Sequence, residues 1–236
     1  MLKPVIIALD THTDTEAFHL VNELSAYVDI FKVGPGLFYR YGRSLIERIQ
    51  KNKKKIFLDV KLFDIPNTVA LAVEVINNLD IYSISVHLSG GEEMLGRVLA
   101  LKSRPLIWGV SVLTSFSGQQ LKNLGINDGV NKQVSRLVKI GLNKNIDGVV
   151  SSAHELPAII KLKKQFTKGQ PAKCIVPGIR LENTGNAKDK NDDQQRIMTP
   201  AGAFKLGADY IVIGRPVIKA PNPKEVLKNV IKGIDK

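Results

Sequence analysis

Short apolar runs alternate along the chain with longer segments in which apolar residues recur about every 3.6 positions. The apolar runs are rich in β-branched residues, which is typical of strands, and they cover residues 5–9, 30–33, 56–60, 84–88, 106–113, 149–152, 174–177 and 210–213. The helical period predicts helices over residues 14–25, 42–51, 65–79, 92–99, 131–143 and 154–166. Hydrophobicity is continuous within the strand runs, which indicates burial on both faces, as in a parallel sheet covered by helices.

Eight strand and helix units in 236 residues fit an α/β fold, a closed (β/α)8 TIM barrel. No linker or break in composition divides the chain, so we expect a single domain over residues 1–236. A doubly wound open sheet is the alternative architecture, and periodicity alone does not exclude it. The nucleotide-binding version of that sheet has less support, because no Gly-x-Gly-x-x-Gly sequence follows the first apolar run.

Basic residues outnumber acidic ones, with 34 Lys and Arg against 22 Asp and Glu and a net charge of +12. This excess favours an anionic partner, either nucleic acid or a small molecule. The lysines are spread over residues 51–55 and over two separate helical segments, so we interpret them as solvated helix surfaces. We therefore expect no nucleic-acid partner, and a charge that favours encounter with a phosphorylated, carboxylated small molecule.

Cysteine, histidine and long apolar segments are sparse. The single cysteine, Cys174, lies in an apolar run and is expected to be a buried, inert thiol. The four histidines lack the paired spacing of zinc or iron sites, so we expect no metal. The apolar run 5–9 is too short for a secretory signal, and no stretch approaches the roughly 20 apolar residues of a membrane span. We expect a cytoplasmic protein with no membrane partner.

Polar and charged residues collect where the predicted strands end. In a (β/α)8 barrel, active sites are built at this C-terminal edge. The residues concerned are Asp10, Lys32, Asp59, Lys61, His87, Thr114, Arg180 and Arg215. His87 lies within an apolar strand, and we interpret it as a core residue rather than as a base. The hydrophilic segment 183–193 follows the seventh predicted strand and is predicted to form a lid over the site.

Asp59 and Lys61 end the third predicted strand, and side-chain alternation places both on the same side. Taken alone, the pair is equally typical of a structural ion pair, with Asp64 as the N-cap of the next helix. Residues 59–69 have the sequence Asp-Val-Lys-Leu-Phe-Asp-Ile-Pro-Asn-Thr-Val, which closely resembles the orotidine 5'-monophosphate decarboxylase signature Asp-x-Lys-x-x-Asp-Ile-Pro-Asn-Thr-Val. The resemblance extends over the whole chain, because further segments match in family order at residues 8–10, 31–34, 86–87, 112–114, 177–180, 193–196, 199–200 and 213–216.

The resemblance implies decarboxylation of orotidine 5'-monophosphate to UMP in pyrimidine biosynthesis, without a cofactor. It implies that Lys61 protonates C6 of the pyrimidine as carbon dioxide leaves, while Asp59 flanks the substrate carboxylate. Lys32 would complete the charged array with Asp59 and Asp64. A homodimer is also implied, in which Asp64 and Thr68 reach into the partner's site. Opposite charges favour the ammonium form of a lysine, and a carboxylate beside the substrate's own carboxylate disfavours the ground state but not the transition state.

A phosphate site is predicted after strands seven and eight. Arg215 follows Gly214 at the end of strand eight, where barrels place phosphate sites, and a guanidinium binds phosphate oxygens bidentately. The resemblance implies that Arg180 is the second phosphate-side residue, beside Pro177, and that Gln194 is a lid residue whose amide bridges phosphate and base. The resemblance also implies that Asp10 and Lys32 bind the ribose hydroxyls. It implies that Thr114 lies near the nucleotide and that Ser117 contacts the edge of the pyrimidine.

The chain departs from the common bacterial pattern at Phe63, where histidine is frequent, and at Leu88, where a small residue is usual. We expect Phe63 to change the packing beside Lys61 and Leu88 to change the barrel lining. Two other functions stay open. Magnesium-dependent sugar-phosphate decarboxylases and aldolases share the Asp-x-Lys-x-x-Asp strand, but they carry a metal-binding glutamate near the position of Lys32 and lack Ile-Pro-Asn-Thr-Val. A nucleic-acid-binding barrel has the support of net charge alone.

Overall fold

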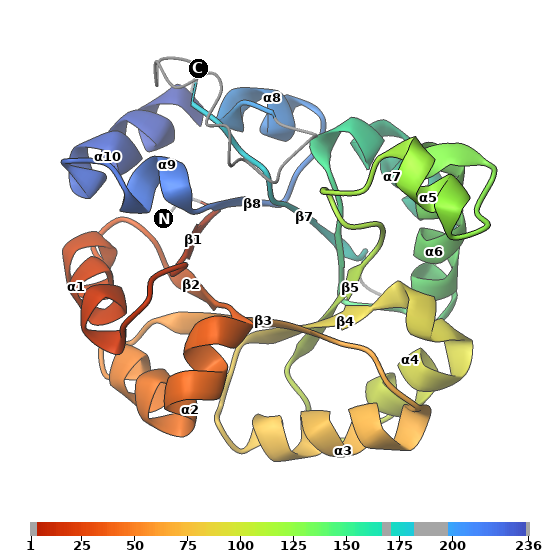
Figure 1. Ribbon diagram of the computed structural model, residues 1–236, viewed down its shortest axis with the longest axis horizontal. Coiled ribbons are helices and arrows are strands. Elements are labelled where there is room, and N and C mark those ends of the chain that lie inside the picture. Colours follow the sequence, from red (N-terminus) through yellow and green to blue (C-terminus); the bar gives the residue numbers. More distant parts are fainter. Residues whose placement is uncertain (1–3, 167–170, 182–197, 235–236) are drawn as a thin grey trace.

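Eight parallel strands close into a barrel in the order β1 to β8 in the computed structural model, which describes residues 4–166, 171–181 and 198–234 (Figure 1). The strands are β1 Val5–Ala8, β2 Ile30–Val33, β3 Lys55–Leu62, β4 Ser83–His87, β5 Leu106–Val110, β6 Gly148–Val150, β7 Lys173–Val176 and β8 Tyr210–Ile213. The predicted (β/α)8 barrel is confirmed. Because β1 pairs with β8, the sheet has no open edge, and the doubly wound alternative is excluded. The predicted lid at 183–193 and Gln194 lie outside the described residues.

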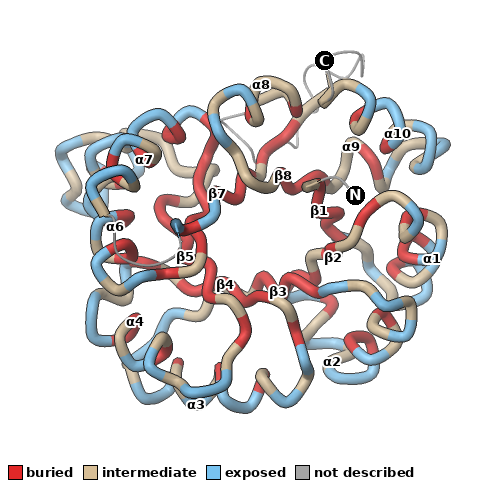
Figure 2. The backbone as a smooth tube through the Cα atoms, turned by 180° about the vertical axis from the view of Figure 1, so that it is seen from behind, coloured by how far each residue is buried: buried red, intermediate tan, exposed pale blue. Residues whose placement is uncertain are grey.

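Helices surround the barrel, and the buried positions follow the strands and the inward helix faces (Figures 1 and 2). The helices are α1 Asp14–Leu24, α2 Pro35–Gln50, α3 Pro66–Asn77, α4 Gly91–Leu99, α5 Gly118–Asn123, α6 Gly129–Asn143, α7 Leu156–Lys163, α8 Pro200–Lys205, α9 Arg215–Ile218 and α10 Pro223–Ile234, with 3-10 turns η1 Leu88–Gly90 and η2 Ala153–Glu155. Within the described ranges, no helix combines the length and the apolar character that crossing a bilayer requires.

The helices differ from their predicted ranges where the apolar period is interrupted or short. α2 begins at Pro35 rather than at residue 42, because proline suits the first helical turn and Gly34 is the N-cap. A kink at Gly42, with φ 50° and ψ −132°, separates that first part from the periodic part. α5, α8 and α9 contain only four to six residues each, which is too short for a 3.6-residue period to be recognised in the sequence.

The apolar core has two parts, one on each side of the sheet. On β1, Val5 and Ile7 pack outward against the helices, whereas Ile6 and Ala8 point into the barrel. The interior part is completed by Ile30, Phe57, Trp108, Val110, Val150, Ile175 and Val212, with the rings of Phe57 and Trp108 centred 4.5 Å apart. A barrel filled in this way is a packed core rather than a channel, so a site can be built only at its rim.

We expect Gly148→Ala to lower the free energy of unfolding by about 1–3 kcal/mol, because the added methyl overpacks the barrel interior. A Cβ at Gly148 would lie 2.7 Å from both Trp108 Cδ1 and Ile175 Cδ1. Gly96→Ala in α4 is the matched control: its Cβ would meet nothing within 4 Å, so helix propensity should raise stability by about 0.5–1 kcal/mol. Urea unfolding measures both changes, and wild-type stability of Gly148→Ala would show that the interior is not close-packed there.

Candidate active site

A cavity of about 290 Å³ opens at the C-terminal ends of the strands. Apolar side chains of the interior core, including Phe57, Val110 and Val212, form part of its wall. The predicted site residues that line it are Asp10, Lys32, Asp59, Lys61, Thr114, Pro177, Arg180, Gly214 and Arg215. These residues come from strands and loops distributed over the whole chain, and barrel closure brings them to one rim.

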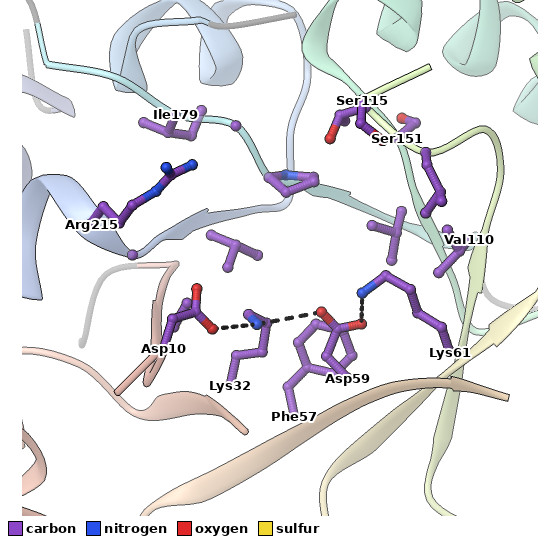
Figure 3. Close-up of a pocket in the computed structure, with 18 of the residues that line it drawn as sticks. Asp10, Lys32, Phe57, Asp59, Lys61, Val110, Ser115, Ser151, Ile179 and Arg215 are labelled. Atoms are coloured by element: carbon purple, nitrogen blue, oxygen red, sulfur yellow. Dashed lines mark hydrogen bonds and ion pairs between the residues drawn. The ribbon is translucent and has the colours of Figure 1, made fainter. Parts of the chain in front are cut away.

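Four of these side chains form a row of alternating charge across the cavity (Figure 3). The Lys32 ammonium lies 3.1 Å from Asp10 Oδ1 and 3.5 Å from Asp59 Oδ2. The Lys61 ammonium lies 2.9 Å from the other oxygen of Asp59. Lys32 and Asp59 are nearly enclosed, with side chains 13% and 12% exposed, so their charges are screened little by water.

The row keeps its two enclosed members ionised. Burial alone would raise the pKa of Asp59, but the positive charges of Lys32 and Lys61 and two hydrogen bonds lower it below its ordinary value. Burial alone would lower the pKa of Lys32, but the carboxylates of Asp59 and Asp10 raise it above its ordinary value. Asp59 is therefore a carboxylate and Lys32 an ammonium throughout the physiological pH range.

Lys61 reaches the cavity from a distorted part of β3. The pairing of β3 with β4 is regular up to Leu58 and shifts before Leu62, and between them Lys61 has φ +49°. Simple alternation along a regular strand predicted that Asp59 and Lys61 would face the same side. Both side chains do face the cavity (Figure 3). The strand between them is not regular, however, because it contains a bulge that the sequence did not reveal.

Arg215 lies on the far side of the cavity from Lys61, and its side chain extends into the cavity from the start of α9 (Figure 3). Gly214 precedes it, and a Cβ there would lie 3.1 Å from Asp10 Oδ2 and 3.3 Å from the Cβ of Ala8. A larger residue at position 214 would therefore crowd the charged row. Arg180 also lines the cavity and donates a hydrogen bond to the carbonyl of Ile179 at 3.0 Å.

Of the predicted site residues that the structure describes, three do not line this cavity. Ser117 is the N-cap of α5, where its hydroxyl accepts a hydrogen bond from the Gln120 amide at 3.3 Å. Asp64 and Thr68 are exposed near the start of α3. The N-cap of α3 is Ile65 rather than Asp64, and Asp64 Oδ1 instead accepts the hydrogen bond of the Ile65 amide at 2.6 Å.

Two serines that the sequence analysis missed line the cavity, Ser115 and Ser151 (Figure 3). Both follow the ends of their strands, so the rule that selected Thr114 applied equally to them. Ser151 is buried, and its hydroxyl has no hydrogen-bond partner among the described residues.

Across the described ranges, no group of three or more His, Cys, Asp or Glu side chains is placed to hold a metal ion. Cys174 is buried in β7, as predicted, and burial raises the pKa of its thiol. Its state under physiological conditions is therefore the unreactive thiol.

The closed barrel and the charged cavity at its rim place the protein in the class of (β/α)8-barrel enzymes. A family model described as "Orotidine 5'-phosphate decarboxylase / HUMPS family" matches residues 3–230, and the chain belongs to this family. Orotidine 5'-phosphate decarboxylase of Coxiella burnetii is 38% identical over 236 residues, covering 98% of this chain and 96% of the relative. The protein of the same name from Saccharophagus degradans is 42% identical over 230 residues, covering 96% and 92%.

Solved structures agree with this assignment. The crystal structure of orotidine 5'-phosphate decarboxylase from Lactobacillus acidophilus has a TM-score of 0.80 and 29% identity, and the match covers 99% of this chain and all of that one. An uncharacterized conserved protein from Geobacillus kaustophilus also has a TM-score of 0.80, with 26% identity and 98% of this chain covered. The family resemblance inferred from residues 59–69 is confirmed.

The two departures from the family pattern both lie outside the cavity-lining set. Phe63 is 63% exposed, and its ring is centred 5.7 Å from that of His87. Leu88 is fully buried in the outer core, between the barrel and the helices. The expectation that Leu88 changes the barrel lining is therefore wrong, because the chain has turned out of β4 before this residue.

His87 provides a test of the charges in the row. Burial lowers its pKa, the positive charge of Lys61 lowers it further, and the negative charge of Asp59 opposes them. We expect Lys61→Met to raise the pKa of His87 toward its ordinary value and Asp59→Asn to lower it further. NMR titration of the His87 ring carbons measures both shifts, with the other three histidines as internal references. An unchanged midpoint in both variants would contradict the electrostatic coupling.

Proposed function

We propose that this chain decarboxylates orotidine 5'-monophosphate to UMP, with Lys61 as the proton donor and without a metal or cofactor. Family membership supports the reaction class. The observation that carries the mechanism is the row of alternating charge, with Lys61 facing the cavity at one side and Arg215 at the other. Such a cavity offers a cationic clamp for a phosphate and an acid beside a carboxylate.

Lys61 and Asp59 would act in sequence on the substrate. The Asp59 carboxylate, held ionised between two ammonium groups, lies next to the position proposed for the substrate carboxylate. Repulsion between them destabilises the bound substrate and is relieved as carbon dioxide leaves. The electron pair of the broken bond stays on C6, and it takes a proton from the Lys61 ammonium, 2.9 Å from Asp59, to give UMP.

The remaining lining residues would hold the nucleotide. Arg215 and Arg180 would bind the phosphate, since guanidinium groups match its oxygens in pairs. Asp10 and Lys32 would hydrogen-bond the ribose hydroxyls. The other proposed contacts are Thr114, Pro177 and Gly214 in the cavity wall, with Ser117 and Gln194 proposed from the family resemblance alone.

We also propose a homodimer in which Asp64 and Thr68 complete the partner's site. Both are exposed and neither lines the cavity of its own chain. Thr68 shares one face of α3 with Leu71 and Val75, which follow it at helical spacing. Large exposed apolar side chains gather here, namely Phe63 at 63%, Ile65 at 67%, Leu71 at 61% and Val75 at 60%. An apolar patch of this kind marks a protein interface, and a symmetric dimer would bury it.

Purified protein should convert orotidine 5'-monophosphate to UMP in the presence of EDTA, and Lys61→Ala should lower kcat by at least about 100-fold, since it removes the acid. Lys55→Ala is the matched control, because Lys55 begins the same strand and pairs with Asp29 at 3.1 Å away from the cavity. We expect it to keep wild-type kcat. A spectrophotometric assay of the pyrimidine measures turnover. Wild-type kcat in Lys61→Ala would refute the mechanism, and activity lost with EDTA would favour the magnesium-dependent alternative.

Shared sites can be tested by mixing two inactive variants. Lys61→Ala and Asp64→Ala should each be inactive as homodimers. In a mixed dimer, one site would carry both substitutions and the other neither, so the mixed dimer should have about half of wild-type activity. Co-expression with two affinity tags and an activity assay of the doubly purified fraction measures this. Absence of recovery in a verified mixed dimer would show that each site is built from one chain.

A further inference from the structure

Ser85 in β4 joins the two functional residues of the neighbouring strand. Its side chain is fully buried, and it is not among the residues that line the cavity. The hydroxyl donates a hydrogen bond to Asp59 Oδ1 at 2.9 Å and accepts one from the Lys61 backbone amide at 2.8 Å. One hydroxyl behind the cavity wall therefore contacts both the carboxylate and the backbone that carries the ammonium group.

The bulge in β3 explains why the Lys61 amide needs this partner. Pairing with β4 matches Leu58 to Ile84 and then Leu62 to Val86, so β3 advances four residues while β4 advances two. Lys61 lies in this unpaired stretch with φ +49°, a conformation that side-chain-bearing residues rarely adopt. A buried amide without a ladder partner is costly, and the Ser85 hydroxyl takes the place of the missing carbonyl.

The direction of both hydrogen bonds is determined by their partners. An ionised carboxylate only accepts, so Ser85 must donate its proton to Asp59. The oxygen lone pairs then remain for the Lys61 amide, which only donates. A hydroxyl meets both requirements at once, whereas a methyl or a thiol would leave one or both partners weakly bonded.

We propose that Ser85 is a positioning residue for the decarboxylation, which holds the Lys61 backbone and the Asp59 carboxylate in one fixed arrangement. This inference rests on the proposed function. The proton donor and the carboxylate beside it then owe their alignment to a group that never touches the substrate. Loss of the hydroxyl should misalign the reacting groups while leaving the phosphate side, around Arg215, unchanged.

β4 itself supplies the matched control. Ser83 lies two residues before Ser85 on the same face of the strand, and it is also fully buried. Its hydroxyl has no hydrogen-bond partner among the described residues. Ser83→Ala therefore removes the same atom from the same buried strand without breaking a hydrogen bond, and it reports the effect of the lost volume alone.

We expect Ser85→Ala to lower kcat by about 10-fold to 100-fold, because it removes hydrogen bonds that involve a charged group. KM and the affinity for UMP should stay within about twofold of wild type. Ser85→Thr keeps the hydroxyl and should recover most of kcat, and Ser83→Ala should match wild type. Steady-state kinetics, UMP titration and thermal unfolding measure these quantities. The lost hydrogen bonds should lower the melting temperature of Ser85→Ala in either case, so the result that marks a purely structural role is a KM that moves together with kcat.

Wild-type kcat in Ser85→Ala, or equal losses in Ser85→Ala and Ser83→Ala, would overturn the inference. An inactive wild-type protein would refute the proposed function separately. Crystal structures of the two variants then decide the inference on geometry. In Ser85→Ala we expect a changed Lys61 φ and a changed distance between Lys61 Nζ and Asp59, and in Ser83→Ala neither. Unchanged geometry in Ser85→Ala would overturn the inference. This test does not depend on Ser85→Thr and holds even if that variant fails to fold.

Discussion

The Asp59 carboxylate is the group on which the rest of the site depends, because it stands buried between two ammonium groups. Its two oxygens lie 3.5 Å from Lys32 Nζ and 2.9 Å from Lys61 Nζ. A charge removed from water is unfavourable unless it is paired and hydrogen-bonded, and removing one partner leaves the other uncompensated. The row from Asp10 to Lys61 is therefore stable as a complete set, and each member holds its neighbour in the ionised form.

Strand register in the barrel assembles this row. Lys32 on β2 is level with Ala8 on β1 and Phe57 on β3. Asp59 lies two residues after Phe57 on β3, and Asp10 lies two residues after Ala8, just past the end of β1, so both lie higher on the rim than Ala8 and Phe57. The Lys32 side chain rises between them and contacts both. Below the row, the packed interior excludes water, and charges next to such a floor interact more strongly than charges in solution.

The sequence predicted the parts of this structure that depend on local pattern. Apolar runs located the eight strands, and polar residues at their ends identified much of the cavity lining, including the charged row, Thr114, Arg180 and Arg215. Features that depend on pairing between strands were missed. The bulge at Lys61 and the role of Ser85 arise only once β3 and β4 are aligned, and no periodicity within either strand encodes that alignment. Ser117 was assigned to the pyrimidine edge from the family resemblance, and its role as the N-cap of α5 is recognised only when the helix boundary is known.

Lys32, near the end of β2, limits the chemistry that this rim can support. The family description joins two groups of proteins, so the barrel alone does not define the reaction. A divalent cation requires several oxygen ligands. Here Lys32 Nζ already contacts Asp10 at 3.1 Å and Asp59 at 3.5 Å. A cation at this position would have to displace an enclosed ammonium group and break both ion pairs, leaving a positive charge unpaired. The carboxylates that would otherwise bind a metal are therefore already paired with ammonium groups. A rim of this kind favours acid chemistry by Lys61.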